Sequence, residues 1–422
     1  MFKKITFSNG FRVILVPAKN TKAVTVLVLV GAGSKYEEKE INGISHFLEH
    51  MFFKGTKKRP TTLKIAETLD KVGGVYNAFT SKELTGYFAK VSKEHLDLAL
   101  EWVSDIFLNS KLESREIERE KKVIIEEINM YLDTPTKYIE DLWEKLLYND
   151  QPAGWSVLGE KENILKFQRH HLLDYLKNHY SALNTILCVA GNFDQKRILE
   201  KIKKYFKKLK PVPPKQKVKV IEQQSEPQVL SYYKKTDQTH LCLGVRGYHL
   251  FHPKRYAQEV LATILGGNMS SRLFILIRER KGLAYYIQTS SELYTDSGYL
   301  RTEAGVPHEN VPQVIKLILK EYKNIKEKKV SKKELKKAKD YLKGTLTLSL
   351  ESSDAKASFY ASQELLTGKI LTLEEKLAKI EKVSVSDVQE VAREIFRPEK
   401  LNLALIGPHK NKEKLFQKLL KI

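Results

Sequence analysis

The first residues of the chain alternate between apolar and polar side chains, a pattern that predicts half-buried β-strands. The stretch from Met1 to Val16 also contains Asn9-Gly10, a pair typical of a tight hairpin turn. No apolar segment with a small-residue cleavage site precedes this stretch, so we expect no leader peptide. No run approaches the roughly 18 apolar residues that a membrane span requires. These observations predict a soluble, cytoplasmic protein with no membrane partner.

A second pattern occurs twice: an extended apolar run ends at a glycine and is followed by a basic helix. The two glycines, Gly191 and Gly407, are 216 residues apart. Two further pairs of residues that precede predicted helices repeat at similar offsets, Gly86 and Gly298 at 212 and Ser114 and Ser331 at 217. Such a nearly constant offset indicates an internal duplication.

Each copy combines strands with long helices, so the predicted fold class is α+β, with two homologous α/β-sandwich halves of about 200 residues each. Three prolines within residues 211–214 exclude a helix between the halves and favour an extended linker. We therefore predict an N-terminal domain at 1–210, a linker at 211–225 and a C-terminal domain at 226–422.

Composition and charge narrow the classes of function. Hydrophobic residues make up 42% of the chain, which is normal for a globular protein and argues against extensive disorder. Cys188 and Cys242 lie in apolar, strand-like runs and are expected to be buried free thiols. The formal net charge of +22 suggests nucleic-acid binding, but the densest basic stretch, Lys203–Lys219, lacks the interleaved aromatic residues of a base-stacking surface. We therefore expect solvated basic faces and no nucleic-acid partner.

Residues 44–56 have the periodicity of a helix and contain the motif His-x-x-Glu-His. His46 and His50 are four residues apart and share one helix face, so their imidazoles can bind one metal ion. Glu49 lies beside them and can take a proton from metal-bound water. Zinc fits best, because two imidazoles and a carboxylate leave its fourth position open.

An ordinary amphipathic helix with surface histidines is the alternative interpretation of this motif. The apolar residues around it argue against that alternative, because burying His and Glu without partners is costly. These apolar residues are Phe47, Leu48, Met51, Phe52 and Phe53. We expect Ser45 or Asn42 to cap the start of the helix and Gly55 to end it.

The stretch 46–56, His-Phe-Leu-Glu-His-Met-Phe-Phe-Lys-Gly-Thr, resembles the signature of the inverzincin (pitrilysin-type, M16) zinc peptidases. It is most similar to the subfamily of mitochondrial processing peptidase and its bacterial relatives. The resemblance implies a zinc endopeptidase with one Zn²⁺ per chain, whose third ligand is a Glu at a set distance beyond the second His. Here Glu127 follows His50 with 76 residues between them, and the neighbouring Glu126 is the less favoured alternative. Glu120 matches the family's second Glu, whose implied role is to support the metal ligands.

Two other stretches resemble the substrate-binding parts of the family. One is the active-site edge strand, which implies that an extended peptide binds by main-chain pairing. Its residues are Asn77, Ala78, Phe79 and Thr80. In the second half, Arg278 and Tyr285 match an Arg/Tyr pair that contacts the substrate and stabilises the oxyanion. Without the resemblance, an ordinary hairpin strand and a surface Arg with a core Tyr are the alternatives.

The second half lacks the metal-binding set. When Leu48 is aligned with Leu261, the residues opposite His46, Glu49 and His50 are Glu259, Ala262 and Thr263. The chain carries both the metal motif and the Arg/Tyr pair, which the resemblance indicates are divided between two subunits in eukaryotic processing enzymes. A homodimer is therefore the expected assembly, with a heterodimer of related M16 chains as the alternative. The competing function is a non-catalytic partner subunit, although such chains usually lose the ligands that are present here.

Overall fold

The computed structural model describes residues 2–422, which divide into two compact units. The first unit comprises the chain up to Asn129, Trp155–Val218 and Thr347–Thr372. The second unit comprises Met130–Gly154, Lys219–Leu346 and Leu373–Ile422. Each unit thus includes one helical segment from the opposite half of the sequence, 347–372 in the first unit and 130–154 in the second. In these two segments the compact units differ from the halves 1–210 and 226–422.

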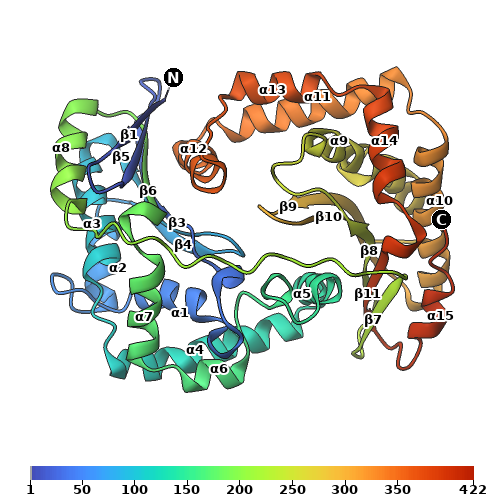
Figure 1. Cartoon of the computed structure of the whole chain (residues 1–422), viewed down its shortest axis with the longest axis horizontal. Coiled ribbons are helices and arrows are strands. Elements are labelled where there is room, and N and C mark those ends of the chain that lie inside the picture. The colour runs from blue at the N-terminus through green and yellow to red at the C-terminus, as the bar shows by residue number, and fades with distance from the viewer. Residues whose placement is uncertain (1) are drawn as a thin grey trace. The chain divides into compact units, whose positions relative to one another are not determined.

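A mixed six-stranded sheet forms the centre of the first unit (Figure 1). Its strands are β1 (Lys3–Thr6), β2 (Arg12–Pro17), β3 (Ala23–Val30), β4 (Val75–Thr80), β5 (Thr85–Ser92) and β6 (Thr185–Gly191). The order is β1-β2-β6-β3-β5-β4, in which β2 and β6 are parallel and all other neighbours are antiparallel. The predicted hairpin at the start of the chain is confirmed, and Gly10 provides the positive φ of +81° at its turn. Strand β4 lies at the edge of this sheet.

Helices cover both faces of this sheet. They are α1 (Ile44–Met51), α2 (Thr62–Asp70), α3 (Leu96–Asn109), α4 (Ser114–Asp133), α6 (Lys161–Lys166), α7 (Arg169–His179), α8 (Gln195–Phe206) and α12 (Ser353–Thr367). Helix α12 packs on β3 and β6, and α3 packs on β3 and β5. Side chains alternate along β5, so Phe88 packs under α12 while Tyr87 contacts Phe107 of α3. A strand covered on both faces is almost entirely apolar, as in the run Ala-Val-Thr-Val-Leu-Val-Leu-Val of β3, in which Thr25 is the one polar residue.

The second unit is built around a five-stranded sheet. Its strands are β7 (Gln228–Tyr233), β8 (Thr239–Arg246), β9 (Tyr286–Leu293), β10 (Gly298–Val306) and β11 (Leu401–Gly407). Its helices are α5 (Pro135–Tyr148), α9 (Arg255–Gly266), α10 (Val311–Glu327), α11 (Lys332–Ser349), α13 (Leu373–Glu381), α14 (Val385–Ile395) and α15 (Glu413–Gln417), with a π-helix at Phe274–Arg280. Within residues 2–422, no helix has the length and apolar character needed to cross a membrane.

The two sheets share one topology, which confirms the predicted duplication. The order β7-β11-β8-β10-β9 repeats β2-β6-β3-β5-β4, and the single parallel pair, β7 with β11, lies at the same place. The covering helices correspond too, because α5 packs on β8 and β11 as α12 packs on β3 and β6. Cys188 lies in the core under α12 and Cys242 in the core under α5, and both are buried free thiols, as predicted. The α+β class with two related halves is therefore confirmed.

The proline-rich stretch 211–225 contains no helix or strand. Its first part is held in the first unit, where the main-chain N–H of Lys215 donates to the Asn178 carbonyl at 3.2 Å. Its later part is held in the second unit, where the N–H of Ile221 donates to Oε1 of Gln151 at 2.8 Å. The stretch is thus extended and hydrogen-bonded at both ends.

Candidate metal centre

Helix α1 carries two of the predicted metal ligands, and its start is held by a residue that sequence reasoning missed. The N-cap is Gly43, with a φ of +100°, and not Asn42 or Ser45 as expected from the sequence. Buried Glu37 provides the acceptor instead, since the main-chain N–H groups of Gly43 and Ser45 each donate to its carboxylate at 2.8 Å. A carboxylate at this end satisfies N–H groups that the helix leaves free and is favoured by the helix dipole.

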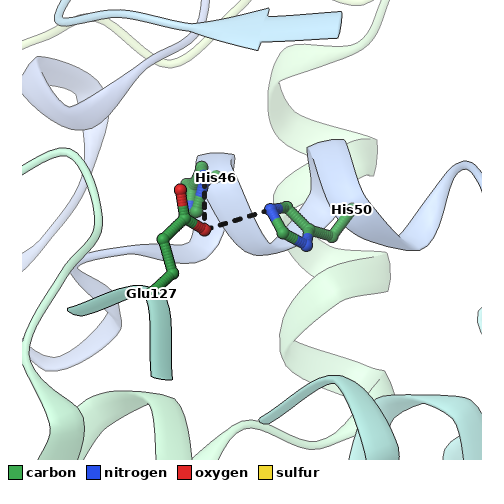
Figure 2. A group of neighbouring side chains, drawn as sticks. All are labelled: His46, His50 and Glu127. Carbon is green, nitrogen blue, oxygen red and sulfur yellow. Dashed lines mark ion pairs between the residues drawn. The ribbon is translucent and has the colours of Figure 1, made fainter. Parts of the chain in front are cut away.

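Three side chains from two helices converge (Figure 2). The Nε2 atoms of His46 and His50 each lie 3.5 Å from Oε2 of Glu127, which is on α4. Within residues 2–422 these three form the only group of three or more His, Cys, Asp and Glu residues whose possible ligand atoms all lie within 4.8 Å of one another. Glu126, the alternative third ligand, is exposed and lies outside this group.

The spacing of these atoms suits a zinc ion. Tetrahedral zinc with bonds to N and O of 2.0–2.2 Å holds its ligand atoms about 3.3–3.6 Å apart. Both distances to Oε2 of Glu127 are 3.5 Å. Burial, with a smaller effect of His50, lowers the pKa of His46 to about 4, so this imidazole is neutral and can donate a lone pair. The residues present therefore fit zinc.

A second carboxylate on α4 contacts His50. Oε1 of Glu120 lies 2.7 Å from Nδ1 of His50, and Glu120 is only 2% exposed. With a metal bound, this contact keeps the proton of His50 on Nδ1 and leaves Nε2 free to act as a ligand. Burial lowers the pKa of His50, but the hydrogen bonds to Glu120 and Glu127 outweigh burial and raise it to about 9.

Glu49 lies next to the two histidines on α1 and contacts the edge strand. Its Oε2 accepts a hydrogen bond of 2.6 Å from Oγ1 of Thr80, the last residue of β4. Burial raises the pKa of Glu49, and the hydrogen bond from Thr80 opposes this rise only in part. A carboxyl group with a raised pKa is suited both to accept and to return a proton.

The predicted substrate strand is β4, and its main chain pairs with β5 on one side only. Asn77 is exposed, and its Oδ1 accepts a hydrogen bond from the Ala78 N–H at 2.9 Å. Ala78 is buried, while Phe79 packs against the core under α12. The strand is thus anchored by its side chains, and its outer main-chain edge can accept another strand.

Arg278 and Tyr285 lie in the second unit. Arg278 is in the π-helix, and the carbon of its guanidinium group lies 4.8 Å from the ring centre of Phe274 and 5.9 Å from that of Tyr285. Tyr285 is 75% exposed, which excludes the alternative of a core tyrosine. The Arg278 side chain is 39% exposed. Contact of the two residues with a substrate stays a prediction.

Comparison with known proteins gives the family. The family described as Insulinase (Peptidase family M16) matches residues 12–161, which include all three converging side chains. The family described as Peptidase M16 inactive domain matches residues 166–342, which include Arg278 and Tyr285. The chain is 39% identical to the uncharacterized zinc protease YmxG of Bacillus subtilis, over 97% of this chain and 99% of that protein. The chain belongs to peptidase family M16.

Other M16 relatives agree with this assignment. An uncharacterized zinc protease of Rickettsia felis is 35% identical over 95% of this chain and 96% of that protein. The crystal structure of a protease from Helicobacter pylori superposes with a TM-score of 0.90 at 26% identity, covering 97% of this chain and 99% of that one. A Pseudomonas fluorescens structure described as a peptidase M16 inactive domain has a TM-score of 0.88 at 18% identity, covering 96% of this chain and 98% of that one, and shows the fold alone. The names of the sequence relatives support a peptidase that uses zinc.

Proposed function

We propose that this chain is a zinc-dependent endopeptidase that hydrolyses peptides or presequence-like segments in extended conformation, with one Zn²⁺ per chain. The observation that carries the proposal is the convergence of His46, His50 and Glu127 beside Glu49. Three protein ligands favour a catalytic over a structural site, because structural zinc sites usually have four. Zinc, when bound, would act as a Lewis acid that lowers the pKa of water and polarises the scissile carbonyl.

Glu49 acts first as general base and then as general acid. It takes a proton from the attacking water while the water oxygen bonds to the scissile carbonyl carbon, and it returns that proton to the leaving amine as the C–N bond breaks. The hydrogen bond from Thr80 holds one carboxylate oxygen, which leaves the other for the proton. The pKa of Glu49, raised by burial, supports the return of the proton.

The substrate pairs with the free edge of β4 along residues Asn77, Ala78, Phe79 and Thr80. Main-chain hydrogen bonds depend on an extended backbone more than on particular side chains. This mode of binding favours unfolded or short peptides over folded proteins. The hydrogen bond from Thr80 to Glu49 links this strand to the proton-transfer step.

Arg278 and Tyr285 bind the substrate and donate hydrogen bonds to the developing negative oxygen. In this proposal a homodimer brings the Arg/Tyr pair of one chain to the metal site of a second copy. A heterodimer with a related M16 chain is the alternative assembly. Glu120 takes part through His50, whose ring it orients.

The substitution Glu49→Gln tests the proposed role directly. The variant should retain one zinc per chain, since Glu49 is not among the three converging residues, while kcat/KM on a mixed peptide library should fall by about 10²–10⁴-fold. Glu126→Gln, an exposed change next to Glu127, is the matched control and should alter neither quantity. Normal turnover by the Glu49→Gln variant would exclude the mechanism. A wild-type chain that binds no zinc would favour the non-catalytic partner subunit.

A further inference from the structure

Lys54 contacts the carboxylate that orients His50. Its Nζ lies 2.6 Å from Oε2 of Glu120, while Oε1 of the same carboxylate lies 2.7 Å from Nδ1 of His50. Each oxygen of this carboxylate, which is only 2% exposed, therefore has its own charged or polar partner. A buried carboxylate depends strongly on such partners, because its charge is costly to hold away from water.

The arrangement spans two helices. His50 is in the last turn of α1, and Lys54 is four residues later in the turn that follows, where its N–H donates to the Met51 carbonyl at 3.1 Å. Glu120 is on α4, seven residues before Glu127, so both carboxylates lie on one face of that helix. The terminal torsion of a Glu side chain is broad, and a partner on one oxygen leaves the carboxylate free to turn. A second partner on the other oxygen fixes its plane.

We propose that Lys54 is a positioning residue of the metal site: it fixes the plane of Glu120 so that Glu120 holds the His50 ring with Nε2 directed at the metal. The inference rests on the proposed function, because it concerns the same ligand set. Lys54 is not itself a ligand, since a lysine ammonium has no lone pair. It acts only through Glu120 and His50.

Zinc affinity of the full-length protein, measured by competition with a chelator, tests this role without reference to activity. Lys54→Met keeps most of the unbranched side chain and removes its charge, and we expect the zinc affinity to fall about 10–100-fold. Lys54→Arg should retain most of the affinity because it retains the charge. Lys58→Met is the matched control: Lys58 pairs with Glu101 at 2.8 Å, and its loss should leave zinc affinity unchanged.

A double-mutant cycle separates positioning from a general structural effect. If Lys54 acts through Glu120, adding Lys54→Met to Glu120→Gln should lower zinc affinity by less than about twofold more. A merely structural ion pair would lower the melting temperature of the metal-free protein, and it would leave the visible spectrum of the Co²⁺-loaded protein unchanged. We expect that spectrum to change in Lys54→Met and to recover in Lys54→Arg.

Two outcomes overturn the inference: zinc affinity of Lys54→Met equal to that of the wild type, or effects of Lys54→Met and Glu120→Gln that multiply. If Lys54→Met does not fold, the zinc affinity of Lys54→Gln is measured instead and judged by the same two outcomes. A wild-type protein that binds no zinc would remove the proposed function and the role of Lys54 together. If the wild type binds zinc and Lys54→Met binds it with the same affinity, only the role of Lys54 is excluded.

Discussion

Helices α1 and α9 hold corresponding places in two units with one strand order, and each packs against the outermost strand of its sheet. In α1 the motif residues are His46, Glu49 and His50, whereas the aligned residues of α9 are Glu259, Ala262 and Thr263. The offset between Ser114 and Ser331 likewise places Lys337 and Gly344 of α11 at the positions of Glu120 and Glu127 in α4. The second unit keeps the backbone but none of the five side chains. The two units thus share a backbone arrangement, and a few side chains decide whether that arrangement can form a metal site.

The aligned positions of the two helices also differ in how their polar groups are satisfied. Residues of α1 contact distant parts of the first unit: Glu37 at the start of the helix, Thr80 on β4 and Glu120 on α4. In α9, Thr263 donates to the Glu259 carbonyl of its own helix at 2.9 Å. The motif residues of α1 therefore have partners on distant segments, whereas Thr263 bonds within its own helix.

Loss of a proposed metal ligand should have the largest effect and tests the comparison directly. His50→Ala removes one of three converging groups and leaves Glu120 buried without its imidazole partner. We expect no zinc in the purified variant at chelator concentrations that leave the wild type fully loaded, and hydrolysis reduced to background. Thr263→Ala, the aligned change in α9, should retain one zinc per chain and full activity. Metal analysis of both variants decides, and equal zinc loss in Thr263→Ala would break the comparison.

Subunit mixing tests whether the two units contribute different parts of one active site. Glu49→Gln and Arg278→Ala should each be inactive alone. If a symmetric dimer shares its sites, each mixed dimer has an intact Glu49 opposite an intact Arg278 in one of its two sites. About half of the dimers in an equal mixture are mixed, so about a quarter of the wild-type activity should return. The measurement is kcat on a peptide substrate after co-refolding or co-expression. No recovery in dimers shown to be mixed would mean that each chain works alone or with another protein.

The proton on His50 offers a pH-dependent test of the first unit. The carboxylates beside His50 raise its pKa to about 9, whereas burial lowers the pKa of His240 in the second unit, whose Nδ1 lies 3.0 Å from the Tyr286 hydroxyl. Below pH 9 the metal-free His50 is protonated, so zinc must displace one proton and binds more tightly as the pH rises. We expect zinc affinity to increase about tenfold per pH unit between about pH 6 and 8.

Calorimetry in buffers of different ionisation enthalpy measures this displaced proton. About one proton should leave per zinc at pH 7.5, because His46, with a pKa of about 4, is already neutral. Glu120→Gln removes a carboxylate that raises the pKa of His50 and should reduce the release. Zinc binding with no proton release would contradict the charge assigned to His50.

Local patterns predict much of this molecule, and contacts between distant segments account for what they miss. The duplication follows from spacing along the chain, and the shared face of His46 and His50 follows from helical periodicity. The edge position of β4 and the choice of Glu127 as third ligand come instead from the resemblance to the M16 peptidases. No periodic pattern indicates the roles of Glu37 and Lys54. Glu37 lies six residues before the N-cap of α1, and Lys54 follows α1 and contacts Glu120 on α4. Asn42 and Ser45 are residue types that favour the N-cap, yet the main-chain N–H groups at the start of α1 donate to the buried carboxylate of Glu37 instead. The placement of 130–154 and 347–372 in the opposite units likewise depends on packing that no single segment encodes.

The smallest effect we predict concerns Thr80, which joins the edge strand to Glu49. Thr80→Val preserves shape and removes the hydroxyl that donates to Glu49 at 2.6 Å, whereas Thr80→Ser preserves the hydroxyl. Loss of one hydrogen bond to a charged group is worth about 1.5–3 kcal/mol, so kcat should fall about tenfold or somewhat more in Thr80→Val and little in Thr80→Ser. KM should change little in both variants, because the main chain of β4 stays available for pairing, and zinc content should remain at one per chain. A fall in kcat of equal size in both variants would show that Thr80 acts on the strand and not on Glu49. It would contradict the proposed link between the substrate strand and proton transfer.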